Sequence, residues 1–420
     1  MHSITQLNLF ADNELGDLVK LNTVLNELPD QELINALDEE RPTGRDDYSN
    51  LSMWRALIAK FVFQHSTIES LIRELNRNSQ LREACGFQPH HLLINGQYKL
   101  FLAPSSAAFS RFTSRLINHL DKVHEMFIHL VKALYQKLPD LGERLAIDGK
   151  IIESQANQPT KQKNPDNRSE HEATWTAKKY HDKENNVTQT TWYYGYRVHL
   201  ICDTQYELPI AYEVTPANKS ESTIAKDLVD ELTDQQAERG EYFMADRGYD
   251  GTPLIKKIER RSMTAIIDNR HMWKDGEQTR QYRDTDLVYD EDGQVFFVDN
   301  FGKPILLKYE GYDCSNDSLR YKFHPKYDDR RIFRIKRSED VRIFSKVART
   351  SHKFKRLYNE RTAVERVNGR LDRDFLFENH TIRGLKKMDL HVSLAFITNL
   401  TFALAKVKGN IVDHLASWVA

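Results

Sequence analysis

Three short apolar runs that each end in an acid place the tightest constraint on how this chain can fold. Residues 145–147, 242–245 and 265–267 lead directly into Asp148, Asp246 and Asp268. Runs of this length are typical of buried strands rather than of core helices. The pattern therefore predicts strands of one sheet, the first two of which deliver Asp148 and Asp246 to their C-terminal edges.

The segments between these runs predict an α/β domain. Residues 190–201 and 207–214 are rich in β-formers and are expected to pair as antiparallel strands. Residues 222–232 and 253–260 have helical periodicity. The predicted order is strand, strand, strand, helix, strand, helix, strand. The polar stretch 154–186 is expected to be a long loop.

The flanking segments differ from this domain. Residues 46–138 have helical stripes only, with Ser105 or Ser106 as a cap for the helix that follows. Short β-like runs split by Asp292-Gly293 and Phe301-Gly302 predict a β-rich insertion. We therefore predict a helical, DNA-binding domain at 1–138, the first part of a catalytic domain at 139–270, the insertion at 271–345 and a helical remainder at 346–420. The apolar residues 390–407 are interrupted by polar ones, which favours a core helix over a membrane span.

Charge is distributed unevenly along a chain whose net charge is only −1. The first 50 residues hold eleven acids and three bases, whereas residues 319–373 hold eighteen bases and seven acids. A local surplus of this size can neutralise a phosphate backbone, although a solvated helical face is the simpler interpretation of any single charge run. The three cysteines are far apart and the N-terminus lacks a signal-peptide pattern, so a reducing cytosol is expected.

Three carboxylates without a Cys or His cluster suit a hard, oxygen-liganded cation. Asp148, Asp246 and Glu365 could hold Mg²⁺ or Mn²⁺, and two such ions can drive in-line phosphoryl transfer. A sugar hydrolase with two carboxylates is the alternative, but the basic tract favours a polyanionic substrate. Tyr358, Arg361 and Glu365 are spaced to share one helical face. The plain interpretation of that spacing is an Arg361–Glu365 helix pair.

These residues carry a resemblance to a known family. Tyr358, Arg361 and Glu365 match the Y-x2-R-x3-E-x6-K signature of one group of DDE transposases from bacterial insertion sequences, except that Asp372 stands at the last position, between Arg370 and Arg373. Asp148-Gly149-Lys150 resembles the first Asp motif of the group, and residues 245–249 resemble its second. Residues 194–199 resemble a family strand that usually has Lys where this chain has Arg197, and residues 46–120 resemble the family's N-terminal helical domain.

The resemblance implies a ribonuclease-H-like mixed sheet with flanking helices, with the β-rich insertion between Asp246 and Glu365. It implies cut-and-paste transposition by metal-dependent end cleavage and strand transfer, with Asp148, Asp246 and Glu365 holding two Mg²⁺ or Mn²⁺ ions. The implied partners are double-stranded DNA and a second copy of the chain, as a homodimer in the synaptic complex. The implied location is the bacterial cytoplasm, at the nucleoid and not at a membrane. The residues expected to contact DNA are Arg247, Tyr358 and Arg361, and with less support Lys150, Arg197, Asn368 and Arg373.

Some alternatives stay open at this point. The main rival function is an inactive DNA-binding protein that keeps the transposase fold. If Glu365 is not the third acid, Asp250 or Asp268 comes next. Trp273 could stack on a flipped base, but ordinary packing is favoured. His199 is interpreted as a strand residue near the site rather than a metal ligand.

Overall fold

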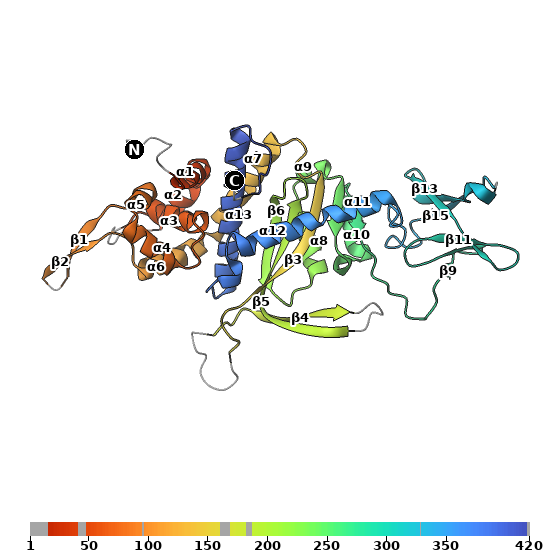
Figure 1. Ribbon diagram of the computed structural model, residues 1–420, viewed down its shortest axis with the longest axis horizontal. Helices are drawn as coiled ribbons and strands as arrows, with labels where there is room; N and C mark the ends of the chain where they lie inside the picture. The colour runs from red at the N-terminus through yellow and green to blue at the C-terminus, as the bar shows by residue number, and fades with distance from the viewer. Residues whose placement is uncertain are drawn as a thin grey trace. The chain divides into compact units, whose positions relative to one another are not determined.

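The computed structural model describes residues 16–40, 48–94, 96–159, 169–181, 187–327 and 329–417. The chain divides into two compact units. Unit 1 comprises Met1–Pro139, Ile151–Tyr196 and Asn368–Ala420, and unit 2 comprises Asp140–Lys150 and Arg197–Val367. Strands β3 and β5 and helix α12 contribute residues to both units, and Figure 1 labels the elements along the chain.

Unit 1 is built mainly from helices. They are α1 (Leu18–Glu27), α2 (Gln31–Glu39), α3 (Asn50–Val62), α4 (Ile68–Arg77), α5 (Ser79–Cys85), α6 (Ser106–Asn118), α7 (Leu120–Lys137) and α13 (Leu385–Lys408), with the short 3₁₀ helix η4 (Phe377–Asn379). The predicted cap of α6 is Ser105, whose hydroxyl accepts the Ala108 amide at 3.3 Å. The prediction that this region is entirely helical is wrong. Strands β1 (His90–Ile94) and β2 (Gln97–Phe101) form an antiparallel hairpin there.

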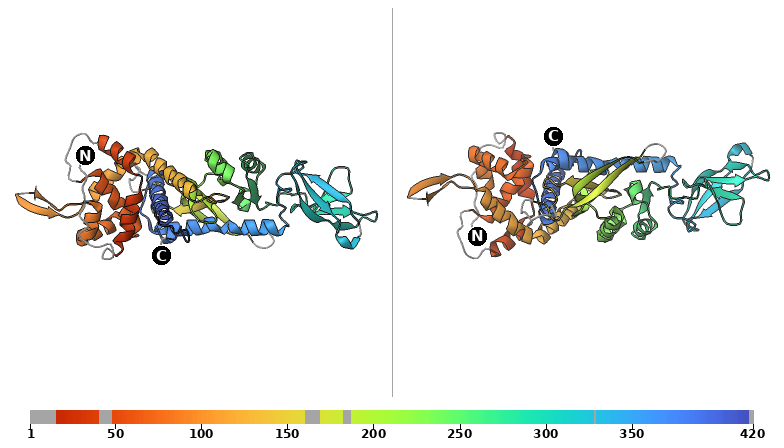
Figure 2. Two further views of the ribbon diagram at one scale, coloured as in Figure 1. Left: turned by 90° about the horizontal axis from the view of Figure 1, so that it is seen from above. Right: turned by 90° about the horizontal axis from the view of Figure 1, so that it is seen from below.

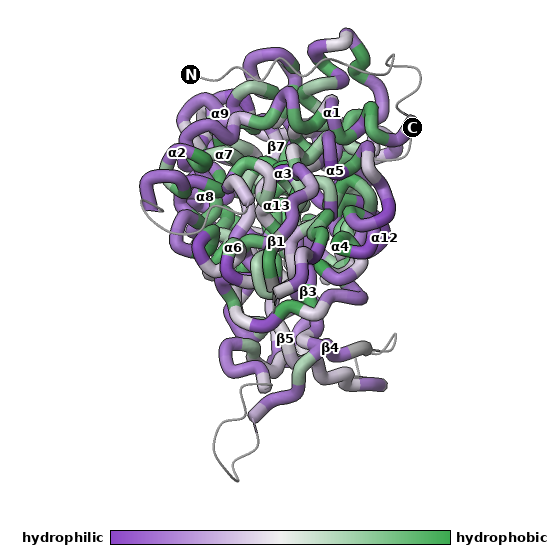
Figure 3. Tube along the Cα trace, turned by 90° about the vertical axis from the view of Figure 1, so that its left-hand side faces the viewer, coloured by the Kyte–Doolittle hydropathy of each residue, from purple (hydrophilic) through white to green (hydrophobic). Residues whose placement is uncertain are grey.

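Helix α13 is the core element of unit 1. It packs against α7, α1 and α3, and most of its residues are buried. By length and composition alone it could cross a membrane, but 78% of its most apolar window is buried inside the protein, as expected of a core helix. Figure 3 shows hydrophobic stretches running through the helices of this unit.

A mixed sheet supplies the framework for the acids. Its order is β4-β5-β3-β7-β8, and β6 pairs with β5. The strands are β3 (Arg144–Glu153), β4 (Thr174–His181), β5 (Val187–Asp203), β6 (Pro209–Pro216), β7 (Tyr242–Ala245) and β8 (Thr264–Ile267). Strand β7 runs parallel to both β3 and β8, whereas β4 is antiparallel to β5. The seven predicted strands and helices form in the predicted succession, but the structure adds a strand and an α-helix to it. Strand β4 lies inside the stretch predicted to be a loop, and α9 (Asp234–Arg239) follows α8 (Glu221–Glu231).

Helices flank the part of the sheet that lies in unit 2. They are α8 (Glu221–Glu231), α9 (Asp234–Arg239), α10 (Thr252–Arg260), α11 (His352–Glu360) and α12 (Thr362–Arg373), with the 3₁₀ helix η2 (Arg247–Tyr249). Helix α11 contacts β7 and β8, while α8 contacts β6 and α10. In Figure 2 the green helices α8 and α10 and the blue helix α11 lie on opposite sides of the strands. The apolar runs of β3, β7 and β8 are buried, as expected of strands covered on both faces, which explains why these runs are continuously apolar.

Between β8 and α11 the chain forms two small antiparallel sheets. One has the order β12-β11-β10-β9 and the other β13-β14-β15. Their strands are β9 (Arg280–Gln281), β10 (Leu287–Tyr289), β11 (Val295–Val298), β12 (Pro304–Leu306), β13 (Lys308–Asp313), β14 (Ser318–Lys322) and β15 (Ile332–Lys336), and the turn η3 (Pro325–Tyr327) joins the last two. The predicted turn glycines Gly293 and Gly302 have φ of 78° and 75°, which glycine adopts without steric cost. The two sheets share a buried aromatic and aliphatic core that includes Tyr321 and Phe344.

Candidate active site

Asp148 lies on β3 directly after the residues that pair with β7. Leu145 to Ile147 are fully buried, and Asp148 itself is half-buried. Burial raises the pKa of its carboxyl, and the negative charges of Asp246 and Glu365 raise the pKa further, while Arg361 acts in the opposite direction. Contrary to prediction, the strand does not end here, because β3 continues to Glu153.

Asp246 follows the last residue of β7. Since Ala245 is the register partner of Ile147, the residues Asp148 and Asp246 stand next to one another after adjacent parallel strands. The side chain of Asp246 also caps η2, accepting the Gly248 amide at 2.8 Å. The carboxylate therefore has a local structural role in addition to its place beside Asp148.

Glu365 lies on α12, close enough to Asp148 for its charge to raise the pKa of Asp148. Its Oε1 atom is 2.9 Å from Nη2 of Arg361, so the helix pair considered from the sequence is formed. The Arg361 guanidinium also lies over the Tyr358 ring, 5.6 Å from the ring centre. Helix α11 ends at Glu360 and α12 begins at Thr362, with Arg361 between them in a helical conformation. Arg361 thus links the aromatic ring of one helix to the acid of the next.

The three acids provide a suitable donor set for a hard cation, but their carboxylates do not converge. Among the residues that the structure describes, no group of three His, Cys, Asp or Glu side chains is close enough to hold a metal ion. Carboxylate oxygens alone suit Mg²⁺ or Mn²⁺. The carboxylate of Glu365 is instead engaged by Arg361, 2.9 Å away.

A family model described as the transposase DDE domain matches residues 140–400, well over half of the chain. The chain belongs to the DDE transposase family. No curated protein matches it. Among solved structures, a similar one is described as the cryo-EM structure of piggyBac transposase synaptic complex with hairpin DNA. It is 12% identical with a TM-score of 0.33, covering 94% of this chain and 81% of that one. DDE transposase domains generally use divalent metal ions.

The predicted DNA-contacting residues of this transposase have varied surroundings. Arg247 is half-exposed and pairs with Asp268, its Nη2 atom 2.7 Å from Oδ2. Lys150 is half-buried on β3, two residues beyond Asp148. Asn368 and Arg373 fall in unit 1, where Arg373 pairs with Asp374 at 2.6 Å. Their roles toward DNA stay predictions.

The residues that the sequence offered as alternative site residues also contact other side chains in the structure. The buried carboxylate of Asp250 is 2.7 Å from Nη2 of Arg342, so both substitute third acids, Asp250 and Asp268, are held in ion pairs. Trp273 packs against the insertion core with the Arg280 guanidinium 4.3 Å from its ring centre, which favours packing over base stacking. His199 is fully buried beside Thr215 at 3.0 Å. Burial and the neighbouring Arg197 lower the pKa of His199 to about 3, so the ring is neutral.

Two further residues near the acids were not among the predicted site residues, although Tyr249 closes the motif at residues 245–249. Glu221 opens α8 and forms an ion pair with Arg197, with Oε1 and Nη1 2.7 Å apart. Tyr249, at the end of η2, is fully buried, and burial raises its pKa well above 10, followed by the charges of Glu221, Asp148 and Asp246. Glu221 belongs to no motif, and only its position at the start of a predicted helix could have singled it out.

The insertion of the transposase carries like charges on one sheet face. Leu319, Tyr321 and Ile335 turn into the core, so the alternate residues of β14 and β15 face outward. Directly opposed across the strands are Lys308 and Lys322, and Arg320 and Arg334. We call this set, with Lys336, the basic sheet face.

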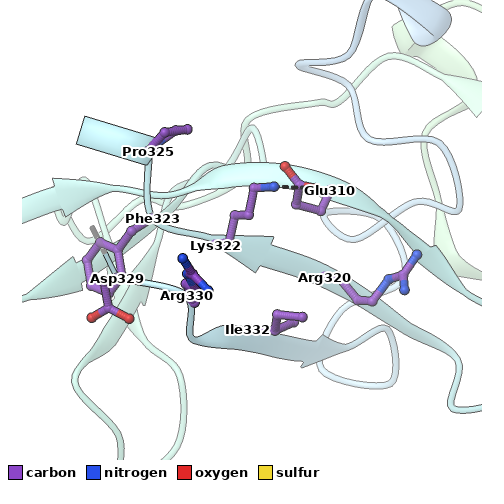
Figure 4. Close-up of a pocket in the computed structure, with 8 residues that line it drawn as sticks. All are labelled: Glu310, Arg320, Lys322, Phe323, Pro325, Asp329, Arg330 and Ile332. Carbon is purple, nitrogen blue, oxygen red and sulfur yellow. Dashed lines mark ion pairs between the residues drawn. The ribbon is translucent and has the colours of Figure 1, made fainter. Parts of the chain in front are cut away.

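Among the described residues, Glu310 and Asp313 form ion pairs with this face. Glu310 is 2.8 Å from Lys322 and 3.4 Å from Lys308, and Asp313 is 3.7 Å from Arg334. Directly opposed like charges destabilise a sheet. A pocket of about 440 Å³ opens beside this face (Figure 4). It is lined by Glu310, Arg320, Lys322, Phe323, Pro325, Asp329, Arg330 and Ile332.

Proposed function

We propose that this chain is the transposase of a bacterial insertion sequence, which cuts the ends of its element and inserts them into new DNA. Asp148, Asp246 and Glu365 form its catalytic triad on a ribonuclease-H-like sheet and hold two Mg²⁺ or Mn²⁺ ions. The observation that carries the proposal is the register of β3 and β7, which sets Asp148 and Asp246 side by side within reach of the charge of Glu365.

The side chains of this site have different proposed roles. Asp148 and Asp246 are fixed by adjacent strands, so little reorganisation is needed at these positions. Glu365 releases Arg361 to join them, and the freed guanidinium then pairs with a DNA phosphate beside Tyr358. The ions, when bound, supply an activated water or 3′-hydroxyl and stabilise the leaving oxygen. Arg247, Lys150, Arg197, Asn368 and Arg373 are further proposed phosphate contacts.

Two transfers complete the reaction. In the first, the oxygen of water bonds to phosphorus at each element end, and the P–O bond to the 3′ oxygen breaks to leave a 3′-hydroxyl. In the second, that hydroxyl attacks a target phosphodiester and displaces the target's own 3′ oxygen, which takes up the proton. Both ends must be joined to one target, which requires a synaptic dimer at the bacterial nucleoid.

The test is cleavage of a labelled duplex that carries the element's own ends, in Mg²⁺, Mn²⁺ or EDTA. We expect nicks at the ends in either metal and none in EDTA. Specific binding without cleavage in any metal would instead support the alternative, an inactive DNA-binding protein with the transposase fold. Activity on a sugar polymer that is indifferent to salt would exclude both, because binding to phosphates weakens steeply with ionic strength.

The basic sheet face is proposed as a second contact with the DNA backbone. Its opposed pairs leave positive charges that a phosphate chain would neutralise. We expect the double variant Arg320→Ala/Arg334→Ala to bind DNA more weakly in EDTA, with a salt dependence shallower by about two charges. The exposed Lys303, in the turn that precedes β12, is the control, and Lys303→Ala should change neither.

The stability of the double variant shows whether the basic sheet face binds DNA or is only exposed to solvent. Removing the opposed pair relieves repulsion, so the double variant should be at least as stable as the wild type. A variant that is more stable and binds DNA with the same affinity and salt slope would show that the face does not contact DNA.

A further inference from the structure

Two glycines next to the acids leave room for a fourth carboxylate. A Cβ atom at Gly149 would lie 2.9 Å from Oε1 of Glu221 and 3.2 Å from Cδ of Arg197. A Cβ atom at Gly248 would lie 2.9 Å from Oδ1 of Asp246 and 3.5 Å from Oε2 of Glu221. The two oxygens of Glu221 therefore lie close to the backbone beside both Asp148 and Asp246.

Arg197 fixes the position of this carboxylate. Its Nη1 atom is 2.7 Å from Oε1 of Glu221, and the exposed fractions of the Arg197 and Glu221 side chains are 11% and 30%. Glu221 is also the first residue of α8, where the amide dipoles of the helix favour a negative charge. The ion pair with Arg197 thus holds the Glu221 carboxylate among other acids, a position that repulsion would otherwise disfavour.

The environment of Tyr249 also points to a ligand at this site. Its hydroxyl is buried and has no hydrogen-bond partner among the residues that the structure describes. The negative charges of Glu221, Asp148 and Asp246 all reach it and, with burial, keep it protonated. A buried O–H without an acceptor is costly, and such groups in native proteins commonly have a functional reason. Tyr249 is thus a proton donor without a partner among the described residues, and it lies within electrostatic range of three carboxylates.

We propose that Glu221, held by Arg197, is a fourth acid of the metal site, where it strengthens divalent-cation binding at Asp148 and Asp246, and that Tyr249 donates its hydrogen bond to this cluster when the cation is present. The inference rests on the proposed metal-dependent function. Glu221 and Tyr249 act as positioning residues. Before DNA binds, while Arg361 still pairs with Glu365, the four acids and the counter-charges Arg197 and Arg361 leave two net negative charges. This charge matches the first of the two proposed cations.

The test is Mn²⁺ binding to the full chain without DNA, followed by electron paramagnetic resonance or titration calorimetry. Glu221→Gln should weaken Mn²⁺ binding about 10-fold or more, the size of effect typical for residues that support metal ligands. The matched control is Asp227→Asn, which removes one acid from an exposed position on the same helix and should leave Mn²⁺ affinity unchanged.

Two further variants keep the result decisive if Glu221→Gln folds poorly. Gly149→Ala displaces the Glu221 carboxylate without removing a charge and should also weaken Mn²⁺ binding. Tyr249→Phe removes only the unsatisfied hydroxyl, so the metal-free variant should be as stable as the wild type while its Mn²⁺ affinity falls. A merely structural Tyr249 would lower stability and leave the affinity unchanged.

The outcomes separate this inference from the proposed function. Wild-type Mn²⁺ binding that is lost in Asp148→Asn but unchanged in Glu221→Gln, Gly149→Ala and Tyr249→Phe would overturn the inference and leave the triad intact. A wild type that takes up no Mn²⁺ through Asp148 would overturn both.

Discussion

Asp148→Asn, Asp246→Asn and Glu365→Gln are each expected to lower end cleavage by about 10³-fold or more while DNA binding is retained. Each substitution keeps the shape of the side chain but removes a charge that would hold a catalytic cation, and stabilisation of that kind is usually the largest contribution to catalysis. The measurement is single-turnover cleavage of the end duplex in Mg²⁺ and Mn²⁺. Asp227→Asn, which removes an exposed acid, should cleave at the wild-type rate.

Stability provides a second readout for Asp148. Burial and the neighbouring acids raise the pKa of Asp148 in the folded state above the ordinary value of 3.8. Its contribution to stability is therefore complete below that value and is lost as pH rises through the folded-state pKa. At neutral pH and without metal, Asp148→Asn removes the free-energy cost of burying an ionised carboxyl. The variant should therefore melt at a higher temperature, by about 2–4 °C for each kcal/mol of this cost. An inactive variant that is also less stable would point to misfolding instead.

The result for Glu365 tests the third acid separately. Cleavage that survives Glu365→Gln would contradict its assignment. Asp250 and Asp268 would then be the next candidates, although each is held by an arginine, Arg342 and Arg247 respectively. The companion variant Arg361→Lys should keep Glu365 in place but lose the planar guanidinium that pairs with phosphate. It should therefore weaken binding to the ends more than binding of Mn²⁺.

Gly195→Ala should destabilise the fold by about 3 kcal/mol or more, with much of the protein insoluble. A Cβ atom at this position would lie 2.1 Å from the carbonyl oxygen of Ile152 and 2.9 Å from Cα of Glu153. Both neighbours are backbone atoms of β3, so they cannot move without separating the strands. Thermal and denaturant unfolding would measure the loss.

Gly369→Ala is the matched control for this substitution. Gly369 lies on α12, and a Cβ atom there would have no neighbour within 4 Å. Because alanine favours helix over glycine, the variant should be about 0.5–1 kcal/mol more stable than the wild type. Equal stabilities for Gly195→Ala and the wild type would show that β5 does not lie so close to β3.

Elements that depend on local interactions could be predicted from the sequence alone. Continuous apolar runs predicted β3, β7 and β8, since a strand covered on both faces needs apolar side chains at every position. A serine before an apolar helical stripe identified the start of α6, and glycines after Asp292 and Phe301 identified two turns. The spacing of the motifs was sufficient to indicate the DDE transposase family, because it reflects the residue types that the reaction needs and not how the chain packs.

Features that depend on partners distant in the sequence could not be predicted and are seen first in the folded chain. Strand β4 was missed because a polar strand forms through pairing with a neighbour, not through its own hydropathy. The β1–β2 hairpin also depends on pairing, because its apolar residues Leu93, Tyr98 and Leu100 are exposed and so give no pattern of burial. Glu221 was not predicted as a site residue for a similar reason. Its place beside Asp148 and Asp246 follows from the packing of α8 on β6 and from two glycines that admit its carboxylate, and no local pattern records either.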